Sequence, residues 1–172
     1  MTVTTNSLNP GPSDVLDSAA FRKVLGHFAT GVVAITAIDP DSGLPTGLAA
    51  NSFTSVSLDP PLVGFCVAHT SSSWPRIRNA GQYCINILAE HQEEVCRQLS
   101  RKGEEKFQGV GWAPSPGGAP MLDEAVAWLE VTTEDEHLAG DHVIVVARVR
   151  QLAAEDRSPL LFFRGGYGRF EG

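Results

Sequence analysis

Short apolar segments separated by turn-forming residues make up most of the chain. Residues 32–38 and 62–68 are almost wholly apolar, which predicts two buried strands. Asp39 to Gly43 has the composition of a hairpin turn, and the acidic residues 134–138 predict a second turn. Segments rich in strand-forming residues predict further strands at 83–88, 126–133, 143–152 and 159–163.

Helices are expected to be fewer than strands. Apolar residues recur with helical spacing after Asp17 and Ser18, which predicts a helix over residues 18–29 that ends before Gly31. A short helix is predicted after Ser72 or Ser73, and another over 90–102. Because strands and helices alternate poorly, the order favours an antiparallel barrel with peripheral helices over a doubly wound sheet. The pattern alone defines a closed or half-closed β domain.

The stretch from Gly47 to Pro61 departs from the pattern of a strand that only fills a core. Small and hydroxylated residues alternate there with Phe53 and Val56, and few charges occur. Small residues let a flat ligand approach the backbone, and hydroxyls offer donors and acceptors at fixed spacing. A polar edge strand that faces solvent has the same composition, so both interpretations stay open.

Three other places offer polar groups for a site. The hydroxyls before the predicted short helix suit a phosphate, although an ordinary capped helix is commoner. Lys106 and Phe107 lie in a segment, 103–120, whose glycines and prolines predict a long loop, where they serve either a ligand or surface packing. His142 follows a glycine turn at the start of a strand, where a lone histidine is more often structural.

Composition narrows the function further. With 172 residues the chain suits one domain, and a net charge of −7 argues against a nucleic-acid binder. No apolar run is long enough to span a bilayer, and residues 1–16 lack the features of a signal peptide, so we expect a short disordered lead. Three cysteines and no Cys-x-x-Cys favour a reduced cytoplasmic protein without a metal site.

The usual nucleotide-binding and hydrolase motifs are absent from the sequence. No Gly-x-Gly-x-x-Gly opens a βαβ unit, no P-loop occurs, and no Gly-x-Ser-x-Gly elbow is present. The glycines at 165, 166 and 168 lie too near the C-terminus for such a unit.

Several segments nevertheless resemble one family in order. They are FRKVLGHFATGVVAIT from residue 21, TGLAANSFTSVSLDPPLVGFCV from residue 46, YCINIL from 83, GDH from 140 and LLFFRGGYG from 160. Together they resemble the small flavin reductases that serve two-component monooxygenases, over roughly residues 20–170. The resemblance implies one flavin reductase-like domain over 17–172, with an FMN-binding split β-barrel of Greek-key type.

The resemblance also implies the activity and its partners. Hydride would pass from NADH, rather than NADPH, to FMN or FAD, and the reduced flavin would serve a separate monooxygenase. A cytoplasmic homodimer is expected. His142 is implied as the catalytic residue at the nicotinamide. The implied cofactor-binding residues are Ala50, Asn51, Ser52, Ser57, Cys66, Ser71, Ser72, Ser73, Lys106 and Phe107, with Arg22 and Tyr167 near the same pocket. Asn86 matches a family signature but is equally explained as a buried amide within a strand.

Two alternatives stay open at this point. One is a flavin-binding module without turnover, and the other is an oxidase-like relative of the pyridoxamine-phosphate oxidase group. The Gly-Asp-His motif favours the reductase, because a flavin store needs no nicotinamide pocket.

Overall fold

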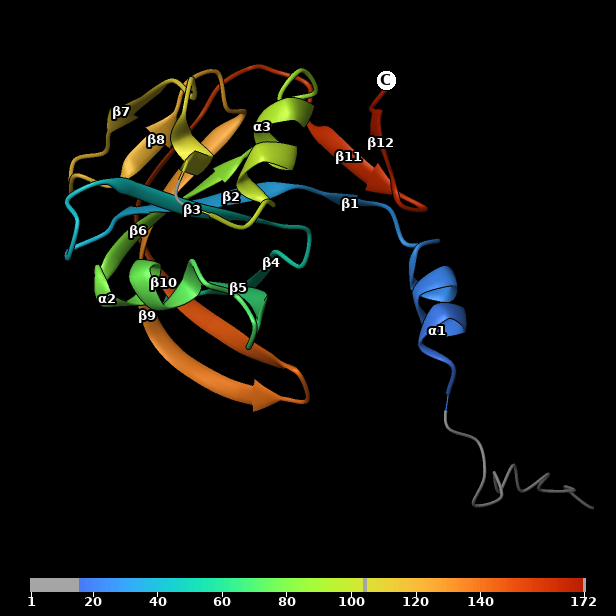
Figure 1. Ribbon diagram of the computed structural model, residues 1–172. Helices are drawn as coiled ribbons and strands as arrows, with labels where there is room; N and C mark the ends of the chain where they lie inside the picture. The colour runs from blue at the N-terminus through green and yellow to red at the C-terminus, as the bar shows by residue number, and fades with distance from the viewer. Residues whose placement is uncertain (1–15, 104, 172) are drawn as a thin grey trace, which may run out of the picture.

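A seven-stranded antiparallel sheet forms the body of the protein in a computed structural model that describes residues 16–103 and 105–171 (Figure 1). The order of its strands is β3-β2-β6-β9-β10-β5-β4. Their bounds are β2 Val33–Ile38, β3 Pro45–Ala50, β4 Thr54–Leu58, β5 Pro61–Ala68, β6 Gln82–Ile87, β9 Ala127–Ala139 and β10 His142–Ala154. The strands β3 and β4 lie at opposite ends of this order, yet only residues 51–53 separate them in the chain. The sheet is therefore curled, with its two edges brought together at that short connection.

Two small sheets and the helices surround the body. β1 (Thr30–Gly31), β11 (Leu160–Phe163) and β12 (Gly166–Arg169) form one small sheet, and β7 (Trp112–Pro114) pairs with β8 (Pro120–Leu122). The helices are α1 (Ser18–Leu25), α2 (Trp74–Asn79), α3 (Glu93–Leu99) and the 3₁₀ turn η1 (Glu105–Phe107). Figure 1 shows α1 standing apart from the body, beyond the β11–β12 hairpin.

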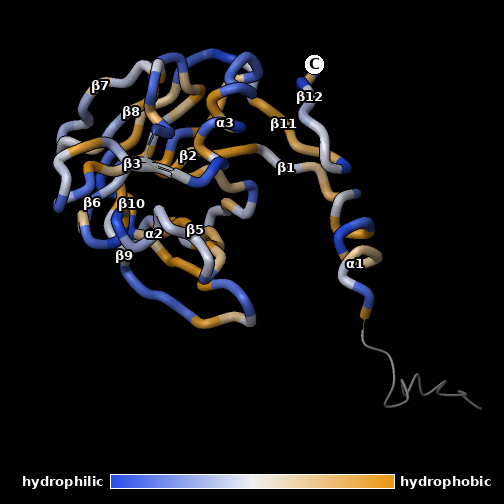
Figure 2. The backbone as a smooth tube through the Cα atoms, viewed as in Figure 1, coloured by the Kyte–Doolittle hydropathy of each residue, from blue (hydrophilic) through white to orange (hydrophobic). Residues whose placement is uncertain are grey.

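The core has two parts. Inside the curled sheet, Phe65, Trp74 and Tyr83 meet edge to face with ring centroids 5.5–6.2 Å apart. A second cluster that includes Leu88, Leu99 and Leu160 joins α3 and β11 to the sheet. Figure 2 shows the apolar strands gathered in the body, where burial of apolar surface stabilises the fold.

A polar network crosses the second part of the core. The side chain of Asn86 is fully buried and donates from Nδ2 to the Thr36 hydroxyl at 3.0 Å and to the Ala34 carbonyl at 3.2 Å. Its Oδ1 accepts from the Leu122 amide at 2.8 Å, and the Thr36 hydroxyl donates to the Pro120 carbonyl. The side-chain amide of Asn86 thus joins β8 to the middle of the main sheet. This contact agrees with the interpretation of Asn86 as a buried amide within a strand.

Several element boundaries differ from the sequence prediction. The acidic turn predicted at 134–138 is wrong, because β9 continues through these residues to Ala139 and the chain turns at Gly140, whose φ is +62°. Residues 134–139 of this strand extend past the core and are mostly exposed, which explains the misleading composition. The helices α1 and α3 are shorter than predicted, and the segment 103–120 contains η1 and β7 instead of one long loop. The strand β12 was not predicted.

The predicted disordered lead, residues 1–16, lies outside the described residues except for Leu16, and the single domain over 17–172 stays a prediction. None of the helices in the described ranges combines the length and apolar character needed to cross a bilayer.

Candidate functional site

A cavity of about 390 Å³ opens where the two edges of the main sheet meet. Residues 48–52 form one wall, and the end of β5 with residues 70–72 forms another. The C-terminal end of α3 and Lys106 complete it, and His142 stands at the start of β10. The volume lies within the range of small-molecule sites. Predicted residues brought together here are Ala50, Asn51, Ser52, Cys66, Ser71, Ser72, Lys106 and His142.

The bend at residues 51–53 is held by a side chain. The Ser52 hydroxyl accepts from the Cys66 amide at 2.9 Å and donates to the Cys66 carbonyl at 3.2 Å. The pairing of Thr54 with Gly64 places Ser52 opposite Cys66 in the same register. The Ser52 hydroxyl therefore bonds both backbone groups of Cys66, as the backbone of a strand residue paired with Cys66 would. Ala49, Ala50 and Asn51 are left along the cavity wall.

The opposite wall is cationic. Arg101, Lys102 and Lys106 line the cavity, and no carboxylate occurs among its described lining residues, although the chain has a net charge of −7. Cations gathered around a concave site in an acidic protein favour an anionic ligand. Arg101 also lies 3.4 Å from a carboxylate oxygen of Glu94, outside the cavity lining.

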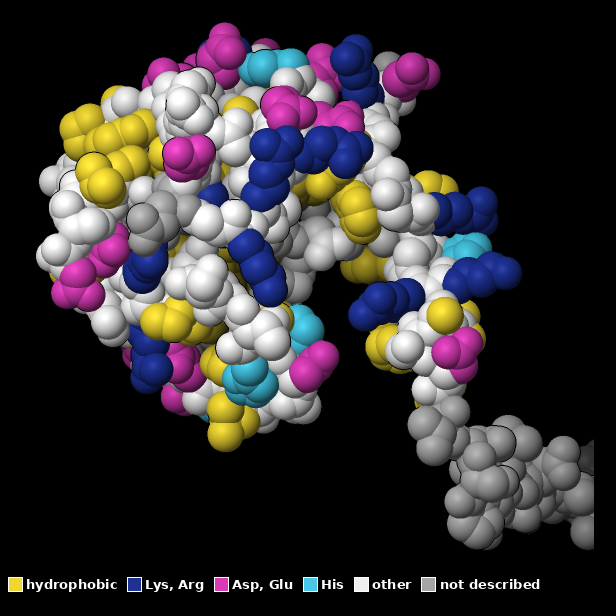
Figure 3. Space-filling view, in the orientation of Figure 1, with side chains coloured by type: hydrophobic (Ala, Val, Ile, Leu, Met, Phe, Trp, Pro, Cys, Tyr) yellow, Lys and Arg dark blue, Asp and Glu magenta, His cyan; other side chains and the backbone are white. Residues whose placement is uncertain are grey.

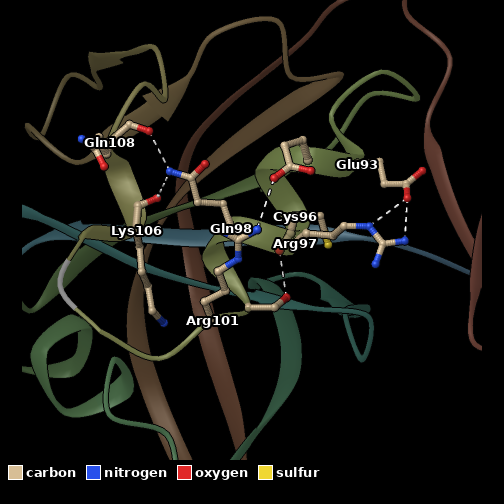
Figure 4. A network of polar contacts seen from close by, with 9 residues as sticks. Glu93, Cys96, Arg97, Gln98, Arg101, Lys106 and Gln108 are labelled. Carbon is tan, nitrogen blue, oxygen red and sulfur yellow. Dashed lines mark hydrogen bonds and ion pairs between the residues drawn. The ribbon is translucent and has the colours of Figure 1, made fainter.

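Lys106 is fixed in place by the protein itself. Its Nζ donates to the Ser73 hydroxyl at 2.8 Å and to the carbonyls of Leu99 and Gly47 at 3.2 and 3.3 Å. Gln98 holds η1 against α3, since its Nε2 donates to the carbonyls of Lys106 and Gln108 (Figure 4). Burial and, to a lesser degree, the nearby Arg76 charge lower the pKa of Lys106.

The three serines before α2 have different surroundings. The Ser71 hydroxyl accepts from the Trp74 amide at 3.2 Å, so Ser71 and not Ser72 or Ser73 supplies the side-chain cap. Ser73 is buried beneath the Lys106 ammonium, and Ser72 is exposed on the cavity side. Ser71 therefore caps the N-terminus of α2, and Ser73 positions Lys106.

His142 and Asp141 form a pair at the mouth of the cavity. The Nδ1 atom of His142 lies 2.7 Å from Oδ1 of Asp141, and this hydrogen bond and charge lower the pKa of the exposed Asp141 carboxyl. β10 pairs His142 with Ala68 of β5, which places the imidazole beside residues that line the cavity. The Asp141 contact fixes one ring nitrogen and leaves the other available to a ligand.

Tyr167 lies in a second, smaller pocket of about 160 Å³ that shares Ala49, Ala50 and Asn51 with the cavity. Its ring packs against Phe162, and Arg97 stands 4.8 Å from the ring centroid. Burial raises the pKa of Tyr167 to about 12, so the phenol keeps its proton at neutral pH.

Five predicted site residues do not line the cavity: Ser73 and Tyr167, described above, and Phe107, Ser57 and Arg22. Phe107 packs with its ring edge against Gly47, where an added Cβ would come within 3.1 Å of it. Ser57 lies on β4 away from the cavity lining, and Arg22 lines a separate hollow beside Arg164. Sequence reasoning missed Thr70, Ser100, Arg101 and Lys102. The adjacent cations Arg101 and Lys102 after α3 could have indicated an anion site, but cations are common at helix C-termini because they interact favourably with the helix dipole. No group of three metal-ligating side chains occurs in the ranges that the structure describes.

A family model described as "Flavin reductase like domain" matches residues 25–171. The chain therefore belongs to the flavin reductase-like family, and the family assignment made from the sequence is confirmed. A flavin reductase of Pseudomonas putida is 47% identical over 156 residues, which cover 90% of this chain and 91% of that protein. The reductase subunit HsaB of a flavin-dependent monooxygenase from Rhodococcus jostii is 42% identical over 160 residues, covering 92% and 81% of the two chains.

Solved structures agree with this assignment. The NADH:FAD oxidoreductase SgcE6 of Streptomyces globisporus, in complex with NAD and FAD fragments, superposes with a TM-score of 0.84 at 34% identity, over 90% of this chain and 93% of that one. The mainly β split-barrel fold predicted from the sequence is thereby confirmed.

Proposed function

We propose that this protein is an NADH-dependent flavin reductase that supplies reduced flavin to a separate flavin-dependent monooxygenase. Family membership over nearly the whole chain supports the reaction class. The monooxygenase partner is supported by relatives such as HsaB, which is described as a reductase subunit. The activity predicted from the sequence is the one that the relatives carry.

One observation of the structure carries the proposal: small residues and cations share a single cavity. Ala49, Ala50 and Asn51 present accessible backbone on one side, which suits a flat ring system. Arg101, Lys102 and Lys106 stand on the other side, with no carboxylate among the described lining residues, which suits a phosphate. A flavin nucleotide combines a flat ring and a phosphate, so the residues present fit it.

The roles of the side chains follow from their positions. Lys106 would attract a phosphate through its fixed positive charge, because its three N–H donors are directed at Ser73 and at the Leu99 and Gly47 carbonyls. Ser52 holds the bend at residues 51–53, so that Ala50 and Asn51 line the cavity where they would contact the ring. Ser71 and Ser72 lie on the adjoining wall. In this arrangement the chain binds and orients its ligands and contributes little acid–base chemistry.

A bound flavin supplies the acceptor for a hydride, and the nicotinamide supplies the donor. His142 is the residue that we assign to the nicotinamide side, since the Asp141 carboxylate holds its ring at the cavity mouth. The nearby Tyr167 keeps its proton, and its ring closes the smaller pocket next to Ala50.

Four further features belong to the proposal. We favour NADH over NADPH because the solved relative SgcE6 is described as an NADH:FAD oxidoreductase, and FMN and FAD are both retained. We expect a homodimer. A cytoplasmic location is supported by three free cysteines, which suit a reducing compartment. No role with nucleic acid is expected for so acidic a chain.

Steady-state oxidation of NADH at 340 nm tests the function, with no flavin, with FMN and with FAD in parallel assays. Turnover that depends on added flavin is the expected result, and the better flavin identifies the preferred acceptor. Tight flavin binding without turnover, with either nicotinamide nucleotide, would replace this function with that of a flavin-binding module.

A further inference from the structure

Within the part of the chain that the structure describes, no side of the helix α1 is buried against another element. None of its residues is buried, and Phe21, Val24 and Leu25 are 53%, 69% and 55% exposed. A helix of eight residues is only marginally stable by itself in water. The Gly26 carbonyl accepts a hydrogen bond from the Arg164 amide, which anchors the end of the arm to the β11–β12 hairpin. An apolar face of this kind requires a cover from elsewhere.

A second exposed apolar surface lies on the outer face of β4, β5 and β10. Ile144 pairs with Cys66 in the sheet, and Val56 packs over Gly64 two residues along β5. Ile144 and Val56 are 39% and 52% exposed. This surface, called here the seat, adjoins the cavity, because Cys66 also lines the cavity wall. Figure 3 shows a deep notch between the body and α1, with apolar side chains on the arm beside it.

The two surfaces carry opposite charge. The arm, residues 16–28, presents Arg22 and Lys23, and Arg164 lies beside it. The β9–β10 hairpin next to the seat presents Asp135 and Asp141, which are exposed, while Glu134 is paired with Arg148 of the same hairpin. Opposite charges on two surfaces of one chain steer identical copies together and fix their orientation.

We infer that α1 is an exchanged arm, whose apolar side seats on the outer face of β4, β5 and β10 of a second copy of this chain. A two-fold axis makes the contact reciprocal, so each copy gives one arm and receives one. The arm of the partner then lies along the cavity, where Cys66 and His142 face outward. This assignment explains why Arg22, predicted near the cofactor pocket, lies outside the cavity of its own chain. It rests on the homodimer proposed above and specifies its interface.

Sedimentation velocity over a range of protein concentrations tests the inference without reference to turnover. The wild type is expected to be a dimer. The arm variant Phe21→Asp/Val24→Asp and the seat variant Ile144→Asp should each dissociate at least 100-fold more easily. The control Leu44→Asp changes a side chain of similar exposure, 64%, outside both surfaces and should stay dimeric. Thermal unfolding verifies that each variant is folded.

A mixing experiment separates an arm-on-seat contact from other dimers. The arm variant keeps a good seat and the seat variant keeps a good arm, so a mixed pair retains one complete contact while each homodimer retains none. The mixture should therefore contain more dimer than either variant alone. Dimers that persist in the arm variant, or a mixture no more associated than its parts, would overturn the exchanged arm while leaving the homodimer intact. A monomeric wild type at all concentrations would overturn both, whereas flavin reduction in that monomer would leave the proposed activity standing.

Discussion

The network around Asn86 and the cavity wall around Lys106 are built in the same way but serve different ends. In both, one side chain donates to two or more backbone or hydroxyl oxygens from separate elements. Asn86 is fully buried between β2, β6 and β8, and its contacts are all within the protein. Lys106 is half-buried and faces a cavity of about 390 Å³. The difference in access to solvent separates a structural network from one that can bind a ligand.

Replacing Asn86 tests the structural side of this comparison and should have the largest effect. Asn86→Leu leaves the Leu122 amide without its acceptor and removes the donor to the buried Thr36 hydroxyl. We expect a loss of about 3 kcal/mol in the free energy of unfolding. Urea denaturation measures it, with Asn79→Leu on the exposed surface of α2 as the control. A loss no larger than that of the control would contradict the structural role.

Replacing Lys106 tests the binding side. Lys106→Met keeps the length of the side chain and removes the charge, so flavin affinity should fall about 10- to 100-fold, as expected when a charge-assisted contact to phosphate is lost. Quenching of flavin fluorescence on titration measures the dissociation constant. Arg157→Met, an exposed cation away from the cavity, should leave it unchanged. If Lys106→Met loses fold stability but not affinity, the lysine belongs with Asn86 as a structural residue.

The pH dependence of flavin binding sharpens the same assignment. Burial lowers the pKa of Lys106, so its ammonium loses the proton at a lower pH than an exposed lysine. The positive charge is present below that pKa and disappears as pH rises through it. Affinity for flavin should therefore fall on the alkaline side in the wild type, and the fall should be smaller in Lys106→Met. Parallel titration curves for the two proteins would count against this source of the pH effect.

His142→Ala should affect the nicotinamide more than the flavin, because the histidine stands at the mouth of the cavity and not against the cation wall. We expect the KM for NADH to rise roughly tenfold, as for loss of one polar contact, with a smaller change in the KM for flavin. His91→Ala, which changes an exposed histidine on another surface, is the control. Equal effects on both Michaelis constants would remove His142 from the nicotinamide side.

Ser52→Ala should have the smallest effect on stability, about 1 kcal/mol for a part-exposed hydrogen-bonding hydroxyl. Its influence should appear mainly as weaker flavin binding, since the bend next to Ala50 loses its attachment to Cys66. Thermal unfolding and flavin titration of the same samples measure both quantities. Ser55→Ala on β4 is the matched control. Unchanged binding in Ser52→Ala would show that the bend keeps its shape without this hydroxyl.

Local pattern predicted a closed or half-closed β domain and one wall of the cavity, while the split barrel and the remaining cavity residues were implied by the family resemblance. Apolar runs predicted β2 and β5, and the small residues from 49 to 52 indicated the cavity wall. The extension of β9 was not accessible, since its acidic residues are stabilised by pairing with β10 and not by burial. Nor could the sequence show that Ser52, Ser71 and Ser73 bond within the protein, while Arg101 and Lys102 face the cavity. Those outcomes depend on contacts between residues far apart in the chain.

The seam between β3 and β4 is a line along which the barrel can widen without breaking strand pairing. No backbone pairing joins these two strands in the described sheet, and residues 51–53 connect them. Separating them breaks no rung of the ladder, but it disturbs the two bonds between Ser52 and Cys66 and the bridge that Lys106 makes from the Gly47 carbonyl to the Ser73 hydroxyl. A protein that must accept a ring and then surrender it to another enzyme benefits from such a joint, since rapid exchange requires an exit that leaves the remaining strand pairing intact.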